Sequence, residues 1–492
     1  MRNVRKNPPG AAEMAGRASK ALAVRSGKYG LSGGEGVSAR PVPARARIML
    51  APLRTPPTDK SSSMKNTPSL IDRHRAVMPT WATLYYKEPI ALVSGEGRRV
   101  RDAQGTEYLD FFAGILTNML GYNVPEVVEA VRDQAGKIMH SSTLYLIESQ
   151  IELAEEIAAL SGIPDARVFF TTSGSEANDA ALMLATAYRR SNQVLAMRYS
   201  YHGRTMSTVP VTGHSTWSPS SFSPFVVNYL QGSYPFRAPF GHLPAGEYIA
   251  AAVADLRETL DVASAGDVAC LIAEPITGVG GFGTPPDGMF GAMQKVLKER
   301  GILFISDEVQ TGWGRTGDHF WGYQAHGVLP DMITFAKGVG NGLAIGGVVA
   351  RAEIMNCLKA NSLSTFGGNP LATRGALETL RYLRRHDLQA NAKARGAELR
   401  AGLAALAEKH GAVGEVRGKG LMQAIEFADR TTKAPHAAAS MALLEETRAR
   451  GLLIGRGGLY ANCNRVAPPL TVTRGEIAEG LGILEAAMKA AA

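Results

Sequence analysis

The sequence predicts an α/β fold, in which helices flank a buried central sheet. Short apolar runs that suit buried strands alternate with helical segments across residues 168–336. Two of these runs, residues 302–305 and 332–336, lead directly to an acid or an amine, as expected where strand ends meet a ligand. From residue 388 onward, helices and strands alternate in a separate pattern, which predicts a compact second domain.

The length and the cysteine content limit the class of protein. A chain of 492 residues can form a large core and two domains. No apolar run reaches about 18 residues, so we expect no membrane-spanning helix. The three cysteines, Cys270, Cys357 and Cys463, are widely spaced, and no Cys/His cluster occurs. This pattern argues against a disulfide framework or a metal site and fits the reducing cytoplasm.

The net charge of +9 comes from the start of the chain. Residues 1–63 hold 12 Lys or Arg and 3 Asp or Glu, whereas the rest holds 41 of each. The body therefore has no overall attraction for nucleic-acid phosphates. Because residues 1–63 are rich in Arg, Ala, Gly, Pro and Ser, we expect a disordered basic tail. Its composition resembles an organellar transit peptide; we favour an overextended start upstream of Met64 and a cytoplasmic protein.

Other elements follow from periodicity, caps and turns. Strands are expected at residues 90–93 and within 98–110, with a turn at Gln104. Asn123 is expected to cap a helix, and residues 214–247 suggest a surface excursion. Further helices are predicted at residues 148–160, 248–260, 290–300, 371–385, 388–410, 437–450 and 476–489, and further strands at residues 168–172, 194–197, 268–273, 413–417, 421–426 and 452–454.

Asp307 and Lys337 are the main chemical signal. Each follows a predicted strand, so neighbouring strands would direct an acid and an amine toward one crevice. The pair suits pyridoxal phosphate (PLP), because a lysine can form a Schiff base with its aldehyde and a carboxylate can keep its pyridine nitrogen protonated. Taken singly, Lys337 is explained as a solvated strand end and Asp307 as part of a polar loop.

A candidate anion site lies at Ser173, Gly174 and Ser175, between a predicted strand and a helix that opens near Glu176. Free backbone N–H groups and the positive end of the helix dipole favour an anion there. Gly174 lets the backbone approach closely, and Ser175 adds a hydroxyl. In isolation, an ordinary capped turn explains the same residues.

Two further loops follow predicted strands. Tyr201 and His202 could present an aromatic face to a flat ring, although such residues are also common at core edges. Residues 278–283 match G-x-G-x-x-G, but two prolines follow where a dinucleotide-binding helix would start. We therefore expect a glycine-rich loop that lines a pocket.

Six motifs in order resemble the class III aminotransferases of PLP fold type I, and the resemblance covers essentially all of residues 70–490. It implies a large domain with a mostly parallel sheet at residues 126–370 and a smaller α+β domain built from residues 64–125 and 371–492. It also implies PLP as the cofactor and a homodimer with shared active sites, with a tetramer as a further option. The motifs are Ser173-Gly-Ser-Glu-Ala-Asn, Tyr201-His-Gly-Arg-Thr, Glu274-Pro-Ile, Asp307-Glu-Val-Gln-Thr-Gly, Phe335-Ala-Lys-Gly and Ser364-Thr-Phe-Gly-Gly-Asn-Pro.

The same resemblance implies roles for individual residues. Lys337 resembles the Schiff-base lysine, which also moves the proton at the substrate Cα. Asp307 resembles the partner of the pyridine nitrogen. The other implied cofactor contacts are the phosphate cradle of Gly174 and Ser175, the stacking Tyr201 with His202 beside it, Glu274 near the ring, Gln310 at the ring hydroxyl, and Thr365, which reaches the phosphate of the neighbouring subunit.

Within the class, residues 318–331 and 416–422 are similar to the alanine–glyoxylate aminotransferase 2 branch. Arg465 resembles the arginine that grips a substrate carboxylate, although a surface arginine would also explain it. Ornithine and 4-aminobutyrate aminotransferases carry a glutamate that can neutralise this arginine, and Val279 stands at that position here. Arg465 should therefore stay free to bind carboxylates in both half-reactions.

The expected activity is transfer of an amino group from an amino acid or ω-amine to a small keto acid, pyruvate or glyoxylate in preference, by a ping-pong mechanism. Trp81, Tyr145 and residues 111–117 are candidate walls of the substrate pocket, although aromatic residues there suit the core equally well. Open alternatives are a 4-aminobutyrate- or ornithine-type enzyme that uses 2-oxoglutarate, an aminomutase or decarboxylase on the same scaffold, and a cofactor-free binding protein. No metal, nucleic acid or membrane partner is expected.

Overall fold

The computed structural model describes residues 68–491. The chain divides into two units between Arg73 and His74. The first unit is described only from residue 68 onward, and helix α1 (Leu70–Val77) begins in it and ends in the second. The expectations for residues 1–63 lie outside the described residues. The elements below belong to the second unit.

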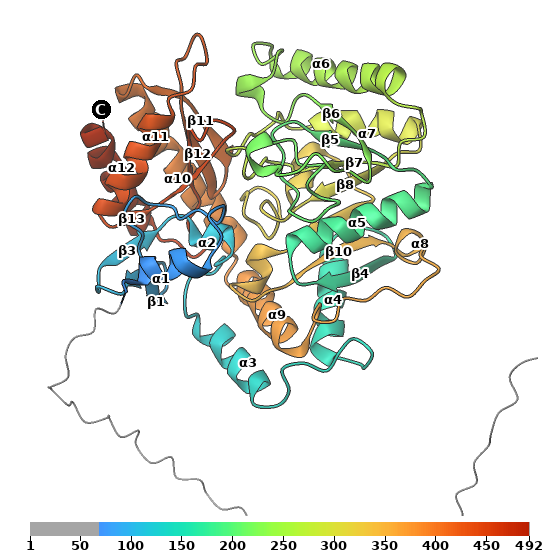
Figure 1. Ribbon diagram of the computed structural model, residues 1–492, viewed down its shortest axis with the longest axis horizontal. Helices are drawn as coiled ribbons and strands as arrows, with labels where there is room; N and C mark the ends of the chain where they lie inside the picture. Colours follow the sequence, from blue (N-terminus) through green and yellow to red (C-terminus); the bar gives the residue numbers. More distant parts are fainter. Residues whose placement is uncertain (1–67, 492) are drawn as a thin grey trace, which may run out of the picture. The chain divides into compact units, whose positions relative to one another are not determined.

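In the described part of the chain, seven strands form the central sheet (Figure 1). β9, β8, β7, β5 and β6 run parallel, and β10 is antiparallel to both of its neighbours, so the predicted mostly parallel sheet is confirmed. Every residue of β5, β7, β8 and β9 is buried, as expected when both faces are covered. The spatial order is β4 (Ala166–Thr171), β10 (Gly346–Arg351), β9 (Met332–Phe335), β8 (Leu303–Asp307), β7 (Cys270–Ala273), β5 (Gln193–Met197) and β6 (Val226–Leu230).

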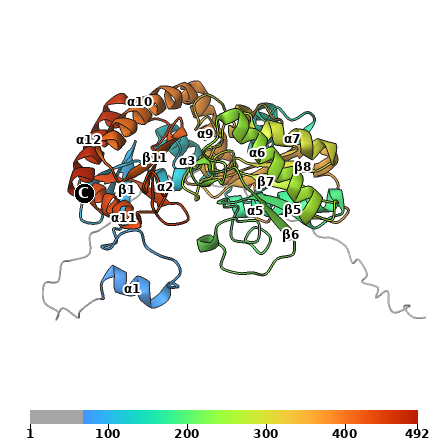
Figure 2. The ribbon, with the colours of Figure 1, turned by 90° about the horizontal axis from the view of Figure 1, so that it is seen from above.

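Helices cover the two faces of this sheet. α5 (Gly174–Arg189) packs its alanine-rich side against one face, which includes Ile305. α6 (Ala245–Glu258) and α7 (Met289–Glu299) pack against the other face, which includes Phe304. Figure 2 shows α5 on the opposite side of the sheet from α6 and α7. Neighbouring strand residues thus serve opposite faces, in keeping with the two-residue period of a strand.

Four further helices complete this layer. α9 packs against both α3 and α4. The predicted helices at residues 148–160 and 371–385 are confirmed by α4 and α9. These helices are α3 (Pro125–Ala135), α4 (Glu148–Leu160), α8 (Ala352–Met355) and α9 (Pro370–Arg385).

Two smaller sheets are built toward the ends of the chain. The first has the order β1 (Leu92–Glu96), β2 (Arg99–Asp102), β3 (Glu107–Asp110), β13 (Leu452–Leu453), and its last pair is parallel, so early and late segments share one sheet. The second has the order β11 (Val413–Lys419), β12 (Met422–Phe427), β15 (Cys463–Val466), β14 (Gly455–Gly457). Helices α10 (Leu388–Lys409), α11 (Ala437–Ala449) and α12 (Arg474–Ala491) accompany them. The domain boundaries after residues 125 and 370 stay predictions.

Two expectations need correction. Asn123 does not cap α3, because the N-cap residue is Val124, whose side chain makes no capping hydrogen bond. Pro125 follows at the first helical position, where it has no N–H group that would need a partner. Residues 214–247 were expected to form a surface excursion, but part of this segment is strand β6, which lies at the edge of the central sheet. Among the described residues, no helix is long and apolar enough to cross a membrane.

Candidate active site

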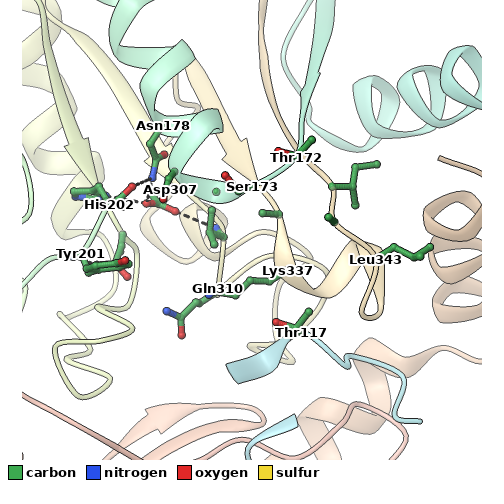
Figure 3. A pocket seen from close by; sticks show the side chains of 18 of the residues that line it. Thr117, Thr172, Ser173, Asn178, Tyr201, His202, Asp307, Gln310, Lys337 and Leu343 are labelled. Carbon is green, nitrogen blue, oxygen red and sulfur yellow. Dashed lines mark hydrogen bonds and ion pairs between the residues drawn. The ribbon is translucent and has the colours of Figure 1, made fainter. Parts of the chain in front are cut away.

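A cavity of about 360 Å³ opens where β7, β8 and β9 end (Figure 3). This volume is typical of a site for a small molecule. Most of the residues expected to contact a cofactor line this one cavity, although they come from separate parts of the chain. They are Gly174, Ser175, Tyr201, His202, Glu274, Asp307, Gln310 and Lys337.

Asp307 and Lys337 reach the cavity from adjacent parallel strands. Asp307 ends β8 and lies opposite Thr334 of β9, and Lys337 follows Thr334 by three residues. Lys337 has a φ of 46°, in the left-handed region that lysine rarely adopts. Such strain persists only where the surrounding structure holds the residue in place, and it is typical of functional sites.

Three donors hold the Asp307 carboxylate. Its Oδ2 accepts hydrogen bonds from Asn178 Nδ2 at 2.7 Å and from His202 Nδ1 at 2.8 Å. Its Oδ1 accepts the backbone N–H of Val309 at 3.1 Å. The residue is buried, and these bonds fix the orientation of its carboxyl group. A carboxylate of this kind suits a cationic partner inside the cavity.

Asn178 was not identified from the sequence. It lies on α5 and also bonds the His202 carbonyl at 2.8 Å and the Thr334 hydroxyl at 2.6 Å, so it links three segments. The available signal was a polar residue beside Ala177 and Ala181 on a helix face that is otherwise apolar. Such a residue needs a partner when it is buried.

The start of α5 forms another wall of the cavity. Ser173 is its N-cap, with Oγ accepting the Glu176 N–H at 3.2 Å. The Glu176 carboxylate in turn accepts the Thr172 N–H at 2.7 Å. Gly174 and Ser175 line the cavity at the helix start, where the first N–H groups have no partner inside the helix. This arrangement fits a phosphate group.

Close packing leaves no space for larger residues beside this cradle. A Cβ on Gly174 would lie 3.1 Å from both methyl groups of Val309. Gly203, with a φ of 139°, comes so close that a Cβ would lie 2.6 Å from Ser175 Oγ. The glycines therefore let two backbone segments converge on the anion site.

Tyr201 and His202 take different positions. Tyr201 lines the cavity and packs edge-to-face on Trp217, with 5.6 Å between ring centroids. His202 is buried and its ring nitrogen bonds Asp307, so it supports the carboxylate. Figure 3 shows both side chains on the Asp307 side of the cavity.

Glu274 connects the cavity to the glycine-rich loop. It follows β7, and its carboxylate accepts the backbone N–H of Tyr201 at 2.8 Å and that of Gly278 at 2.7 Å. Burial, and then the nearby charge of Asp307, raise the pKa of Glu274 to about 7, against the lowering effect of these backbone donors. Glu274 can therefore gain or lose a proton near neutral pH.

Lys337 is electrostatically poised for proton transfer. Burial lowers its pKa, and the positive charge of Arg465 lowers it further. The carboxylates of Asp307 and Glu274 oppose this shift. A lysine with a lowered pKa is a better nucleophile and general base near neutral pH.

Gln310 extends into the cavity beside Lys337 (Figure 3). Its buried amide oxygen has no hydrogen-bond partner among the described residues. Its amide packs so tightly on Gly278 that a Cβ there would lie 2.1 Å from Nε2. A buried amide oxygen without a partner fits a site that is completed by a polar ligand.

Arg465 lies on β15 and is buried, but it does not line the cavity. Its Nη1 donates to the Gly278 carbonyl at 3.3 Å, and Nη2 donates to the Arg456 carbonyl at 2.9 Å. Phe112 lies under its guanidinium at 4.9 Å. Within residues 68–491, Nε has no hydrogen-bond partner, and no carboxylate oxygen lies within 4.0 Å of a guanidinium nitrogen of Arg465.

Three other expected site residues do not line this cavity. Trp81 and Tyr145 are each 70% exposed, and the guanidinium of Arg204 lies 5.4 Å from the Trp81 ring centroid. Thr365 is also exposed. None of the three contributes to the cavity formed by one chain.

The predicted wall at residues 111–117 contributes Thr117 through an unusual turn. Segment α2 (Ala113–Leu116) is left-handed, with φ between 51° and 65° at all four residues. Three of the four are not glycine, and a left-handed conformation is strained for such residues. Asp110 stabilises its start by accepting the N–H groups of Phe112 at 2.7 Å and Ala113 at 3.0 Å. Sequence patterns gave no indication of this conformation.

Comparison with known proteins agrees with this geometry. The family model described as aminotransferase class-III matches residues 82–488. Over 391 residues the chain is 39% identical to the mitochondrial alanine–glyoxylate aminotransferase 2 homolog 2 of Arabidopsis thaliana, covering 79% of this chain and 80% of that one. It is 38% identical over 407 residues to an acetylornithine aminotransferase of Caldanaerobacter subterraneus, covering 82% and 95%.

A solved structure supports the fold. The chain matches a phospholyase from Arthrobacter, solved with phosphoethanolamine, with a TM-score of 0.78 and 32% identity. The match covers 86% of this chain and 99% of that one. The predicted fold type I is confirmed by this likeness.

Proposed function

Because the chain belongs to the class III aminotransferases, a family of enzymes that use pyridoxal phosphate, we propose that it transfers an amino group from an amino acid or ω-amine to a small keto acid by a ping-pong cycle. The observation that supports this proposal most strongly is that Asp307 and Lys337 reach one cavity from adjacent parallel strands, and that the start of α5 lines the same cavity. We favour pyruvate or glyoxylate as the acceptor.

The cavity residues fit PLP. Gly174 and Ser175 would hold its phosphate at the helix start, Asp307 its pyridine nitrogen, and Gln310 its ring hydroxyl. Tyr201 would cover its ring face. When bound, PLP supplies an aldehyde that takes up the amino group and a ring that accepts electrons.

Lys337 would perform the proton transfers. Its Nζ, with a lowered pKa, is suited to take the proton from the substrate Cα and to return it later. The three hydrogen bonds on Asp307 would keep its carboxylate oriented throughout. Asn178 and His202 therefore act on the chemistry through Asp307.

Arg465 would bind the carboxylate of each substrate. Its Nε is unpartnered among the described side chains, and Val279 gives no acid to neutralise it. One arginine could then hold a carboxylate in both half-reactions, which favours acceptors with a single carboxylate. The acetylornithine aminotransferase relative supports the second candidate, an enzyme of the ornithine or 4-aminobutyrate type that uses 2-oxoglutarate.

Other PLP reactions are also compatible with these residues. An aminomutase or decarboxylase would use the same cofactor contacts, and the phospholyase relative indicates that this scaffold also supports elimination chemistry. A transaminase differs from all three because its cycle requires a keto acid. Dependence on an acceptor is therefore the decisive property.

We also propose a homodimer with shared sites. Leu144, Tyr145 and Leu146 are consecutive and exposed, which a second copy could cover. The rings of His140 and Phe366 lie 5.0 Å apart, so this loop is beside the loop that carries Thr365. Both loops would contribute to the partner's cavity, and a tetramer would need a further interface.

We place the enzyme in the cytoplasm; the mitochondrial relative supports the alternative of a transit peptide.

A screen of donors against acceptors tests the proposal. L-Alanine, β-alanine, 3-aminoisobutyrate and other ω-amines would each be paired with pyruvate, glyoxylate and 2-oxoglutarate. We expect turnover only with an acceptor and highest rates with pyruvate or glyoxylate. Lys337→Ala should lose turnover, and full activity in this variant would rule out the assigned role.

A further inference from the structure

Two arginines share one face of the sheet that contains β11, β12 and β15. The register places Arg417 opposite Ala424 and Ala424 opposite Arg465. Two residues further along β12, Glu426 lies opposite Cys463. Because residues two apart point to the same face of a strand, all five side chains lie on one face.

Arg417 uses every nitrogen of its guanidinium. Nη1 donates to the carboxylates of Glu415 and Glu426, each at 2.6 Å. Nε and Nη2 donate to the Gly281 carbonyl at 2.9 and 2.6 Å. Nη2 also donates to the Tyr234 hydroxyl at 2.5 Å. The guanidinium therefore joins the second sheet to the glycine-rich loop.

Gly281 belongs to a tight turn, residues 277–283, that leads back to the candidate active site. Its N–H donates to the Gly278 carbonyl at 3.3 Å. Gly278 also donates to Glu274 at 2.7 Å and accepts from Arg465 at 3.3 Å. Gly281 has a φ of 98°, and a Cβ there would lie 2.8 Å from a sulfur on β15. The turn is thus held close against the sheet.

We propose that Arg417 is a positioning residue for Arg465. By binding Gly281, it fixes the turn whose Gly278 contacts both Arg465 and Glu274. Gly278 supplies one of only two protein acceptors for Arg465 in the described residues, so movement of this turn would reorient that guanidinium. The inference rests on the proposed function, in which Arg465 binds a carboxylate.

The shape of arginine explains why this position needs it. One edge of its planar fork binds the Gly281 carbonyl with two donors, while the other nitrogen binds two carboxylates. A lysine carries its donors on a single atom and could not span both sides. Arg417→Lys would therefore keep the charge and release the turn.

Arg237 offers a matched control. It donates to the same Glu426 carboxylate at 2.8 Å through Nε and to the Lys433 carbonyl at 3.1 Å. It makes no hydrogen bond to the turn. Arg237→Lys would weaken the same buried cluster without releasing Gly281.

The test is a double-mutant cycle that measures pyruvate binding to the PLP-loaded protein by calorimetry, in wild type, Arg417→Lys, Arg465→Met and the double variant. We expect Arg417→Lys to raise the Kd for pyruvate about tenfold and Arg237→Lys by less than about twofold, since only the former releases the turn. In the Arg465→Met background, Arg417→Lys should have no further effect.

Each other outcome contradicts a specific step. Equal effects of Arg417→Lys and Arg237→Lys, or effects of Arg417→Lys and Arg465→Met that multiply, would overturn the positioning role alone. An unchanged Kd in Arg465→Met would overturn the carboxylate-binding role of Arg465 and the inference with it. Turnover in the donor screen tests transamination separately, because pyruvate binding requires no reaction.

A milder variant covers the case in which Arg417→Lys does not fold. Tyr234→Phe removes the hydroxyl that accepts from Arg417 and donates to Glu426, and it changes no charge. We expect the Kd for pyruvate to rise about twofold to threefold, again only while Arg465 is present. An unchanged Kd in this variant would overturn the inference.

Discussion

Arg417 and Arg465 occupy one row of the same sheet, and each is 5% exposed, yet their surroundings differ. Arg417 bonds two carboxylates and the Gly281 carbonyl. Arg465 bonds only two backbone carbonyls, and its Nε has no partner in the described part of the chain.

This difference is what we expect between an arginine that stabilises the fold and one that binds a substrate. A buried charge is costly unless it is paired, so the complete set of partners around Arg417 stabilises the fold. Arg465 lacks an acidic partner among residues 68–491 and would gain most from an incoming carboxylate. Burial alone does not distinguish the two, whereas their partners do.

The largest expected effect is on stability. Arg417→Met should lower the free energy of unfolding by about 3 kcal/mol or more, because the buried Glu426 carboxylate and the half-buried Glu415 carboxylate lose a partner. Arg465→Met breaks no ion pair and should lower it by less than about 1 kcal/mol. Urea denaturation followed by circular dichroism measures both, and equal losses would remove the distinction.

The next effect concerns substrate affinity. Arg465→Met should raise the KM of both the amino acid and the keto acid about 10- to 100-fold, because each loses a charge-assisted hydrogen bond. The matched variant Arg465→Lys should recover part of that loss. Steady-state kinetics checks this, and an unchanged KM would place the carboxylate contact elsewhere.

An added acid should make Arg465 resemble Arg417. Val279→Glu would place a carboxylate next to Gly278, which Arg465 contacts, and should lower kcat/KM for pyruvate about tenfold. Val279→Gln has the same size without the charge and is the control. If both variants behave alike, steric effects explain the result and the charge of position 279 is irrelevant.

The smallest expected effect is a change in pH dependence. The pKa of Glu274 is raised to about 7 in the folded protein, above its unfolded value. The folded state therefore binds more protons between these values, and this group makes stability fall as pH rises through that window. Glu274→Gln should remove that part of the slope in denaturation measured from pH 4 to pH 8; an unchanged slope would contradict the raised pKa.

Strands that are marked by a short apolar run next to a charged residue could be predicted from the sequence. β8 and β9 are short apolar runs that end at Asp307 and before Lys337, and both lie where the pattern placed them. β10 was missed because it begins with Gly346 and Gly347, which suggest a turn. A Cβ on Gly347 would lie 2.6 Å from a backbone oxygen, so close packing of strands explains these glycines.

Contacts between distant segments could not be predicted. The partners of Asn178 on three segments depend on how α5 crosses the sheet. The row of Arg417 and Arg465 depends on the register of β11, β12 and β15, which no local pattern encodes. The roles assigned to individual site residues stay predictions, although eight of those residues line one cavity.

One measurement tests the proposed activity most directly. PLP-loaded protein is mixed with an amino donor in the absence of any keto acid, and the visible absorbance of the cofactor is followed. We predict one equivalent of keto product together with bleaching, and recovery of the absorbance when pyruvate or glyoxylate is added, neither of which occurs in Lys337→Ala. Continuous turnover with no acceptor, or activity that survives in Lys337→Ala, would contradict the account.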